Sequence, residues 1–103
     1  METAAQETGN RVVVITGAGQ GIGAAIARRF ADQGERLVLV DVNTEHLRQL
    51  VASLEDTGCE ILPVIADVSS KEQVKHLVAQ AKEAFGGIDV LVNNAGIIRD
   101  NLI

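Results

Sequence analysis

Four short apolar segments rich in β-branched residues alternate along the chain with longer amphipathic segments. The apolar segments, which we predict to be strands, are residues 11–16, 36–40, 61–66 and 88–92. Strands that are apolar throughout and joined by helices are typical of a parallel sheet covered on both faces. Right-handed crossovers then give a doubly wound α/β fold with strand order 3-2-1-4, in which the first two helices share one face and the third covers the other. Pro63 cannot donate to a ladder, so we expect the third strand at an edge.

The three amphipathic segments predict three helices. The first covers residues 21–33 before Gly34, and its expected buried face is Ile22, Ala25, Ile26 and Phe30. The second begins from an Asn43 or Thr44 cap and ends at Gly58, with a stripe of Leu47, Leu50, Val51 and Leu54. The third opens with a capping-box pattern at residues 69–72 and closes at Gly86-Gly87, with a stripe of Val74, Leu77, Val78, Ala81 and Phe85.

Four glycines occupy the turn between the first strand and the first helix, which reads Thr16-Gly17-Ala18-Gly19-Gln20-Gly21-Ile22-Gly23. Gly17 permits a tight turn, Gly21 permits close approach to a ligand, and Gly23 permits the helix to pack tightly on the sheet. The amide groups at the start of the helix then face an anion such as a phosphate. The alternative is a plain flexible turn. No Lys-Ser or Lys-Thr pair follows the glycines, so a kinase-type phosphate loop is excluded.

Asp41 follows the second strand, 18 residues after Gly23. A carboxylate at this position can accept hydrogen bonds from both hydroxyls of an adenosine ribose, and it repels a 2′-phosphate. Hydrogen bonds to a charged group contribute about 1.5–3 kcal/mol, so Asp41 predicts NAD, with NADP disfavoured. The alternatives are a solvated loop aspartate or a cap of the second helix.

Three motifs together resemble those of the short-chain dehydrogenase/reductases. They are Thr16-Gly17-x-x-x-Gly21-Ile22-Gly23, Asp67-Val68, and Asn93-Asn94-Ala95-Gly96, in the order in which the family has them. The resemblance covers residues 11–103 and implies a partial Rossmann-type NAD(P)-binding domain. The segment 93–102 is especially similar to the 3-oxoacyl-acyl-carrier-protein reductases. Many of those reductases prefer NADPH, whereas the carboxylate of Asp41 predicts NAD.

The resemblance also implies roles for individual residues. Asp67 would bind the adenine amino group, and the Val68 amide would donate to the adenine ring. Ile22 would lie near the nicotinamide. The expected cofactor-binding set is Gly17, Gly19, Gln20, Gly21, Ile22, Gly23, Asp41, Asp67, Val68, Asn93, Asn94, Ala95 and Gly96. The alternatives are a turn aspartate before a helix for Asp67 and side-chain bonding within a strand-end turn for the asparagines.

The family resemblance implies a catalytic serine and a Tyr-x-x-x-Lys pair further along the chain, in which the tyrosine is the acid/base and the lysine lowers its pKa. The 103 residues contain no tyrosine. We therefore interpret the chain as the cofactor-binding part of an NAD-dependent oxidoreductase that transfers hydride between nicotinamide and an alcohol or ketone, including 3-oxoacyl thioesters. We expect no catalytic residue within it and no activity from it alone.

The composition argues against several other classes of function. A net charge of −5 and only two aromatic residues argue against nucleic-acid binding. The single cysteine, Cys59, excludes an internal disulfide and a multi-cysteine metal site, so we expect a small filler residue there and no metal. Residues 1–10 read as a disordered polar tail without a secretory signal, and no apolar run is long enough for a bilayer, which indicates a cytoplasmic protein. We expect His46 and His76 on solvated helix faces, and Ser69 and Ser70 as caps.

Two alternatives to an oxidoreductase remain open from the residues. The first is a non-catalytic nucleotide-binding or self-associating module, in which the edge of the fourth strand and an uncovered face of strands one to three contact another chain. The second is a fragment of an S-adenosylmethionine-dependent methyltransferase, which also uses a glycine loop and an acid, although the Asn-Asn-Ala-Gly motif is foreign to that class.

Overall fold

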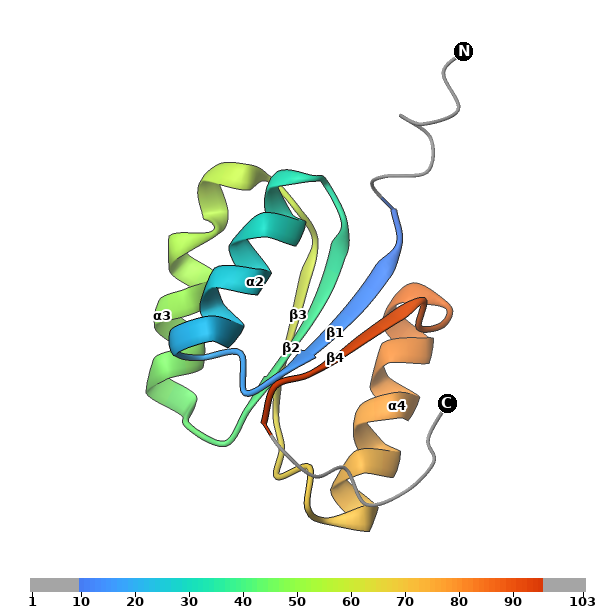
Figure 1. The fold of residues 1–103 in the computed structure, drawn as a ribbon. Helices are drawn as coiled ribbons and strands as arrows, with labels where there is room; N and C mark the ends of the chain where they lie inside the picture. The colour runs from blue at the N-terminus through green and yellow to red at the C-terminus, as the bar shows by residue number, and fades with distance from the viewer. Residues whose placement is uncertain (1–9, 96–103) are drawn as a thin grey trace.

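The computed structural model describes residues 10–95, so the predicted tail falls almost entirely outside the described residues. One parallel sheet contains β1 (Val12–Thr16), β2 (Arg36–Asp41), β3 (Ile61–Ile65) and β4 (Val90–Asn93). Its strand order is β3-β2-β1-β4, which confirms the predicted order and the edge position of the strand that contains Pro63 (Figure 1). The helices are α2 (Gly21–Asp32), α3 (Thr44–Ser53) and α4 (Lys71–Phe85), with a short 3-10 helix, η1 (Glu55–Thr57).

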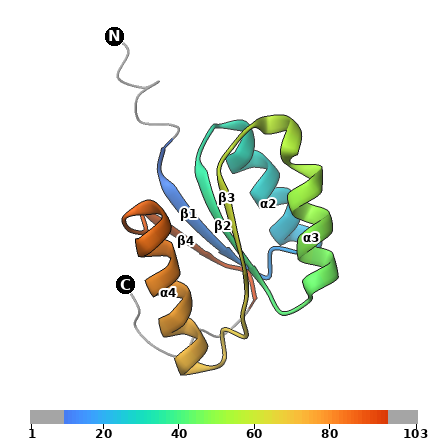
Figure 2. The same ribbon diagram turned by 180° about the vertical axis from the view of Figure 1, so that it is seen from behind.

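The helices lie on the two faces of the sheet as predicted, with α2 and α3 on one side and α4 on the other (Figure 2). Residues alternate along the strands, so that neighbours in sequence enter different cores. The core under α2 and α3 includes Val13, Ile15, Leu37 and Leu39. The core under α4 includes Val12, Val14, Val38 and Val40. These four valines are at most 2% exposed, so the expectation that this face lacks cover is wrong.

The predicted buried face of the first helix is wrong for Ile22 and Ala25, whereas Ile26 and Phe30 pack partly buried against the core. The buried residues of α2 are Gly23, Ala27 and Ala31, whereas Ile22 is 71% exposed. Ala25 is exposed as well, and Ile26 and Phe30 are half-buried. The reason is the close approach of the first turn of α2 to the end of β1, because a Cβ built on Gly23 would lie 2.2 Å from the carbonyl oxygen of Gly17, the residue that follows β1. Only small side chains fit between the helix and the sheet, and the larger ones lie at the flanks of the helix.

The other two helices use the predicted stripes. Leu47 and Leu50 of α3 are buried, as is Leu54 between α3 and η1. On α4 the buried residues are Val74, Leu77 and Ala81. Val51, Val78 and Phe85 are half-buried. The second helix is shorter than predicted, since α3 ends at Ser53 and η1 continues to Gly58, which has φ +73°. No helix among residues 10–95 has the length and apolar character needed to cross a membrane.

Candidate functional site

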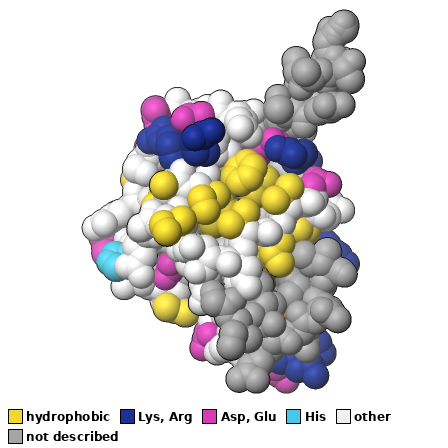
Figure 3. Space-filling model, viewed as in Figure 1, with side chains coloured by type: hydrophobic (Ala, Val, Ile, Leu, Met, Phe, Trp, Pro, Cys, Tyr) yellow, Lys and Arg dark blue, Asp and Glu magenta, His cyan; other side chains and the backbone are white. Residues whose placement is uncertain are grey.

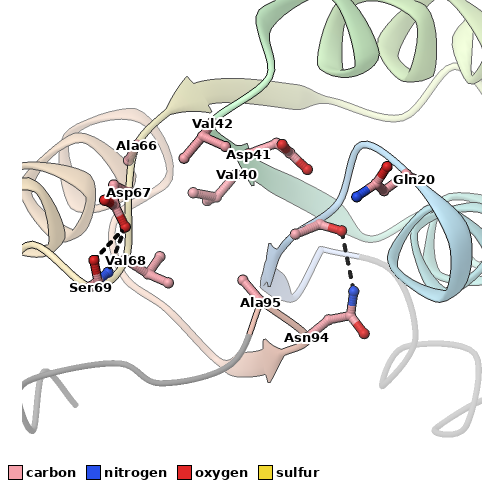
Figure 4. Close-up of a pocket in the computed structure, with 11 residues that line it drawn as sticks. Gln20, Val40, Asp41, Val42, Ala66, Asp67, Val68, Ser69, Asn94 and Ala95 are labelled. Carbon is pink, nitrogen blue, oxygen red and sulfur yellow. Dashed lines mark hydrogen bonds between the residues drawn. The ribbon is translucent and has the colours of Figure 1, made fainter.

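A cleft of about 680 Å³ opens at the carboxyl ends of the strands. At this point the strand order reverses, because β2 and β3 lie on one side of β1 and β4 lies on the other. Open parallel sheets bind ligands at this position. Segments that are far apart in the sequence meet there (Figure 4). The lining residues are Gly17, Gln20, Val40, Asp41, Val42, Ala66, Asp67, Val68, Ser69, Asn94 and Ala95.

The glycine loop supplies Gly17 and Gln20 to one wall of the cleft and leads directly into α2. Gly17 has φ +63° and Gly21 has φ +57°, both in the left-handed region where a side chain is strained. A Cβ on Gly21 would meet nothing within 4 Å, so that glycine is explained by its backbone angle rather than by crowding within the chain. The loop therefore turns sharply at the end of β1 and leaves open space beside the start of the helix.

The first turn of α2 differs from that of the other helices. The Asn43 and Ser70 side chains cap α3 and α4, and each of those helices has a glutamate in its first turn. In α2 the capping position is Gln20, whose side chain makes no capping hydrogen bond, and the first turn holds no acidic residue. The first amide groups of a helix have no partner within the helix and carry a partial positive charge. The start of α2 can therefore receive an anionic group.

Asp41 is the last residue of β2, and it is only 8% exposed. Its Oδ2 accepts a hydrogen bond from the Gly19 amide at 2.8 Å, and its Oδ1 accepts one from the Asn43 amide at 2.9 Å. This burial contradicts a solvated loop aspartate, and Asn43, not Asp41, caps α3. An ionised carboxylate offers about four acceptor positions, so each oxygen keeps one position for a further donor.

Thr16 was not predicted as a site residue, yet it joins the glycine loop to the end of β4. Its side chain is fully buried, and its Oγ1 accepts hydrogen bonds from the Asn94 amide at 3.0 Å and the Ala95 amide at 3.1 Å. The Asn94 side chain donates in return to the Gly17 carbonyl at 3.2 Å (Figure 4). The sequence signal that could have identified Thr16 is a hydroxyl side chain at the end of an apolar strand, directly before the glycines.

Asp67 lies at the opposite wall, where its Oδ1 accepts hydrogen bonds from the Ser69 hydroxyl at 2.7 Å and the Ser69 amide at 2.9 Å (Figure 4). These two bonds lower the pKa of the Asp67 carboxyl, because they stabilise its ionised form. The turn-aspartate interpretation therefore describes Asp67 correctly. It leaves a ligand role open, since both bonds fall on one oxygen.

The structure brings much of the predicted set together. Gly17, Gln20, Asp41, Asp67, Val68, Asn94 and Ala95 line the cleft. Gly19, Gly21, Ile22, Gly23 and Asn93 do not line it, but they belong to the loop, to α2 and to the end of β4. Gly96 lies outside the described residues. Sequence reasoning missed the apolar lining residues Val40, Val42 and Ala66, because a valine or alanine at the end of a strand is expected in the core from its type alone.

Comparisons with known proteins agree with this geometry. The family model of the short chain dehydrogenases matches residues 11–103. A 3-oxoacyl-acyl-carrier-protein reductase of Thermotoga maritima is 40% identical over 93 residues, which are 90% of this chain and 38% of the reductase.

Two solved structures are similar over most of the chain. A structure of NAD⁺-bound xylitol dehydrogenase superimposes with a TM-score of 0.84 at 40% identity, over 88% of this chain and 35% of that one. A structure of L-sorbose reductase from Gluconobacter frateurii, complexed with NADPH and L-sorbose, superimposes with a TM-score of 0.83 at 43% identity, over 87% of this chain and 35% of that one. The chain thus spans little more than a third of the length of these proteins. None of the three is a methyltransferase, so that alternative has no support from them.

Proposed function

Because the chain belongs to the short-chain dehydrogenase family, we propose that it binds NAD, with the adenosine half of the cofactor in the cleft beside Asp41. The observation that carries this proposal is the Asp41 carboxylate itself. It is held by two backbone amides at the edge of the cleft, and each of its oxygens has one acceptor position left. Two vicinal ribose hydroxyls are a matching pair of donors.

The diphosphate of the cofactor would lie against the start of α2. The uncapped first turn supports this placement, because it supplies amide donors and lacks a carboxylate that would compete with or repel a phosphate. The glycine loop leaves the necessary space, since the position of a Cβ on Gly21 has no neighbour within 4 Å. By the family resemblance, Ile22 would lie near the nicotinamide, and its 71% exposure is compatible with a ligand contact.

The adenine ring would lie between the ends of β2 and β3. Val42 is 64% exposed and lines the cleft, so an apolar ring would cover it. Asp67 would accept from the adenine amino group through the oxygen that Ser69 leaves free, and the Val68 amide would donate to the ring. Gln20, Asn94 and Ala95 line the loop side of the same cleft, and Asn93 and Gly96 complete the predicted set.

The choice of NAD over NADP rests on Asp41. The similar structures carry NAD⁺ in one case and NADPH in another, so family membership leaves the choice open. A carboxylate that accepts ribose hydroxyls would repel a 2′-phosphate at short range. Bound NAD would supply the hydride acceptor for oxidation of an alcohol, and NADH the donor for reduction of a ketone. A 3-oxoacyl thioester is one such ketone, in line with the similarity to the Thermotoga maritima reductase.

We propose further that the 103 residues bind the nucleotide without catalysing the reaction. They contain no tyrosine, so the acid/base that the family resemblance implies for proton transfer to the substrate oxygen is not among them. The contribution of this chain would be to bind and orient the cofactor through its backbone amides and Asp41.

Fluorescence titration with NADH and NADPH tests the proposal. We expect the chain to bind NADH more tightly than NADPH, and Asp41→Ala to reduce that preference by about tenfold or more, because it removes charged hydrogen bonds to the ribose. Asp56→Ala is the matched control, since the Asp56 side chain is 71% exposed and contacts Arg28 far from the cleft. Absence of binding to both nucleotides, or an unchanged preference in Asp41→Ala, would contradict the proposal.

A further inference from the structure

Gly19 is a glycine for a different reason from its neighbours in the loop. The described glycines with positive φ are Gly17, Gly21, Gly34, Gly58 and Gly86, so the backbone at Gly19 is one that any residue can adopt. Space is what excludes a side chain. A Cβ built on Gly19 would lie 2.9 Å from Oδ2 of Asp41 and 2.9 Å from Cβ of His46, closer than real Cβ atoms approach other atoms.

Neither neighbour can move aside without losing contacts. The Asp41 carboxylate is fixed on both sides, because Oδ2 accepts from the Gly19 amide and Oδ1 from the Asn43 amide. The His46 Cβ is attached directly to the backbone of the first turn of α3, where the His46 amide donates to Asn43 Oδ1 at 2.8 Å. A side chain at position 19 would therefore displace the carboxylate or push away the start of α3.

We infer that Gly19 is a positioning residue for cofactor choice: its missing side chain leaves the space in which the Asp41 carboxylate lies when it accepts the ribose hydroxyls. This inference rests on the proposed function, because it concerns how Asp41 binds the sugar. If the carboxylate is displaced, the ribose hydroxyls of NAD lose their acceptors, and the 2′-phosphate of NADP is no longer repelled. The two nucleotides are otherwise identical, so a general loosening of the loop would weaken both to the same extent.

The test compares Gly19→Ala with Asp41→Ala, the double variant and Gly87→Ala, each titrated with NADH and NADPH. Gly87→Ala is the matched control, because its Cβ would meet nothing within 4 Å and its φ is not positive. We expect Gly19→Ala to weaken NADH binding by about tenfold and to leave NADPH binding within about threefold, which is the scale of losing charged hydrogen bonds. Because both substitutions act through one carboxylate, their effects on the NADH-to-NADPH ratio should not add.

Each alternative result has a defined meaning. A folded Gly19→Ala variant whose NADH-to-NADPH ratio stays within about twofold of the parent value, or an additive double variant, overturns the inference and leaves the proposed function intact. If Gly19→Ala does not fold, thermal melting of the double variant decides. Recovery of a cooperative transition when Asp41 is also alanine supports the clash with the carboxylate, and an unfolded double variant overturns it. Failure of the parent chain to bind either nucleotide is a failure of the proposed function, independent of position 19.

Discussion

A single buried hydroxyl, that of Thr16, holds the amides of Asn94 and Ala95 against the glycine loop. Thr16→Val keeps the shape of the side chain and removes this acceptor, leaving two amides without a partner. We expect a loss of about 1–2 kcal/mol in the free energy of unfolding, because two partly buried hydrogen bonds are lost. Urea denaturation measures it. Thr16→Ser keeps the hydroxyl and should lose markedly less; equal losses in the two variants would show that the methyl group, not the hydroxyl, is responsible.

Residues at the site could be predicted from the sequence where their type is unusual for their place. Glycines after a strand and an aspartate at the end of the next one have few explanations besides a ligand, and both were found beside the cleft. Thr16 was missed because threonine is common in strands, and its partners lie 78 and 79 residues away. The space beside Gly19 depends on how α3 begins after β2, which no local pattern reveals.

At the scale of elements, α2 shows how far periodicity alone can predict a face. The apolar positions were identified correctly as helical, but the helix turns its smallest residues toward the sheet. A hydrophobic pattern ranks side chains by apolar character, whereas the packing distance set at Gly23 and Gly17 selects them by size. In α3 and α4 the predicted stripes face the core: Leu47, Leu50, Val74 and Leu77 are buried, and Val51 and Val78 are half-buried.

This difference predicts that the same substitution destabilises one face of α2 and leaves the other almost unchanged. Ala27 is fully buried against the sheet, so Ala27→Leu should cost about 1–3 kcal/mol of unfolding free energy through overpacking. Ala25 is exposed in the same helix, so Ala25→Leu should change stability by no more than about 0.5 kcal/mol. Urea midpoints of the two variants, measured together, check the prediction. Tolerance of leucine at position 27 would mean that α2 lies further from β1 than described.

For the molecule as a whole, the topology followed from the order of the segments along the chain. Four strands joined by helices leave few arrangements once crossovers are right-handed, and the observed order β3-β2-β1-β4 is the one expected. The expectation that one face of strands one to three lacks cover was wrong, because the sequence does not show how many strands one helix can cover. Val74, Leu77 and Ala81 are buried together with valines of β1, β2 and β3, so a single helix covers three strands.

The edge formed by β4 is where this chain is expected to associate with itself. Val90 and Val92 are only half-buried, and hydrophobic side chains form a band over α2 and β4 on the face shown in Figure 3. An unpaired edge next to an apolar surface favours pairing with another strand.

We expect the average mass from light scattering to rise with concentration, and Val92→Lys to reduce that rise. Ile65→Lys is the control, because Ile65 is 51% exposed on the opposite edge strand, where Pro63 interrupts pairing. A constant monomer mass at all concentrations would contradict association, and suppression by Ile65→Lys alone would place the contact at β3.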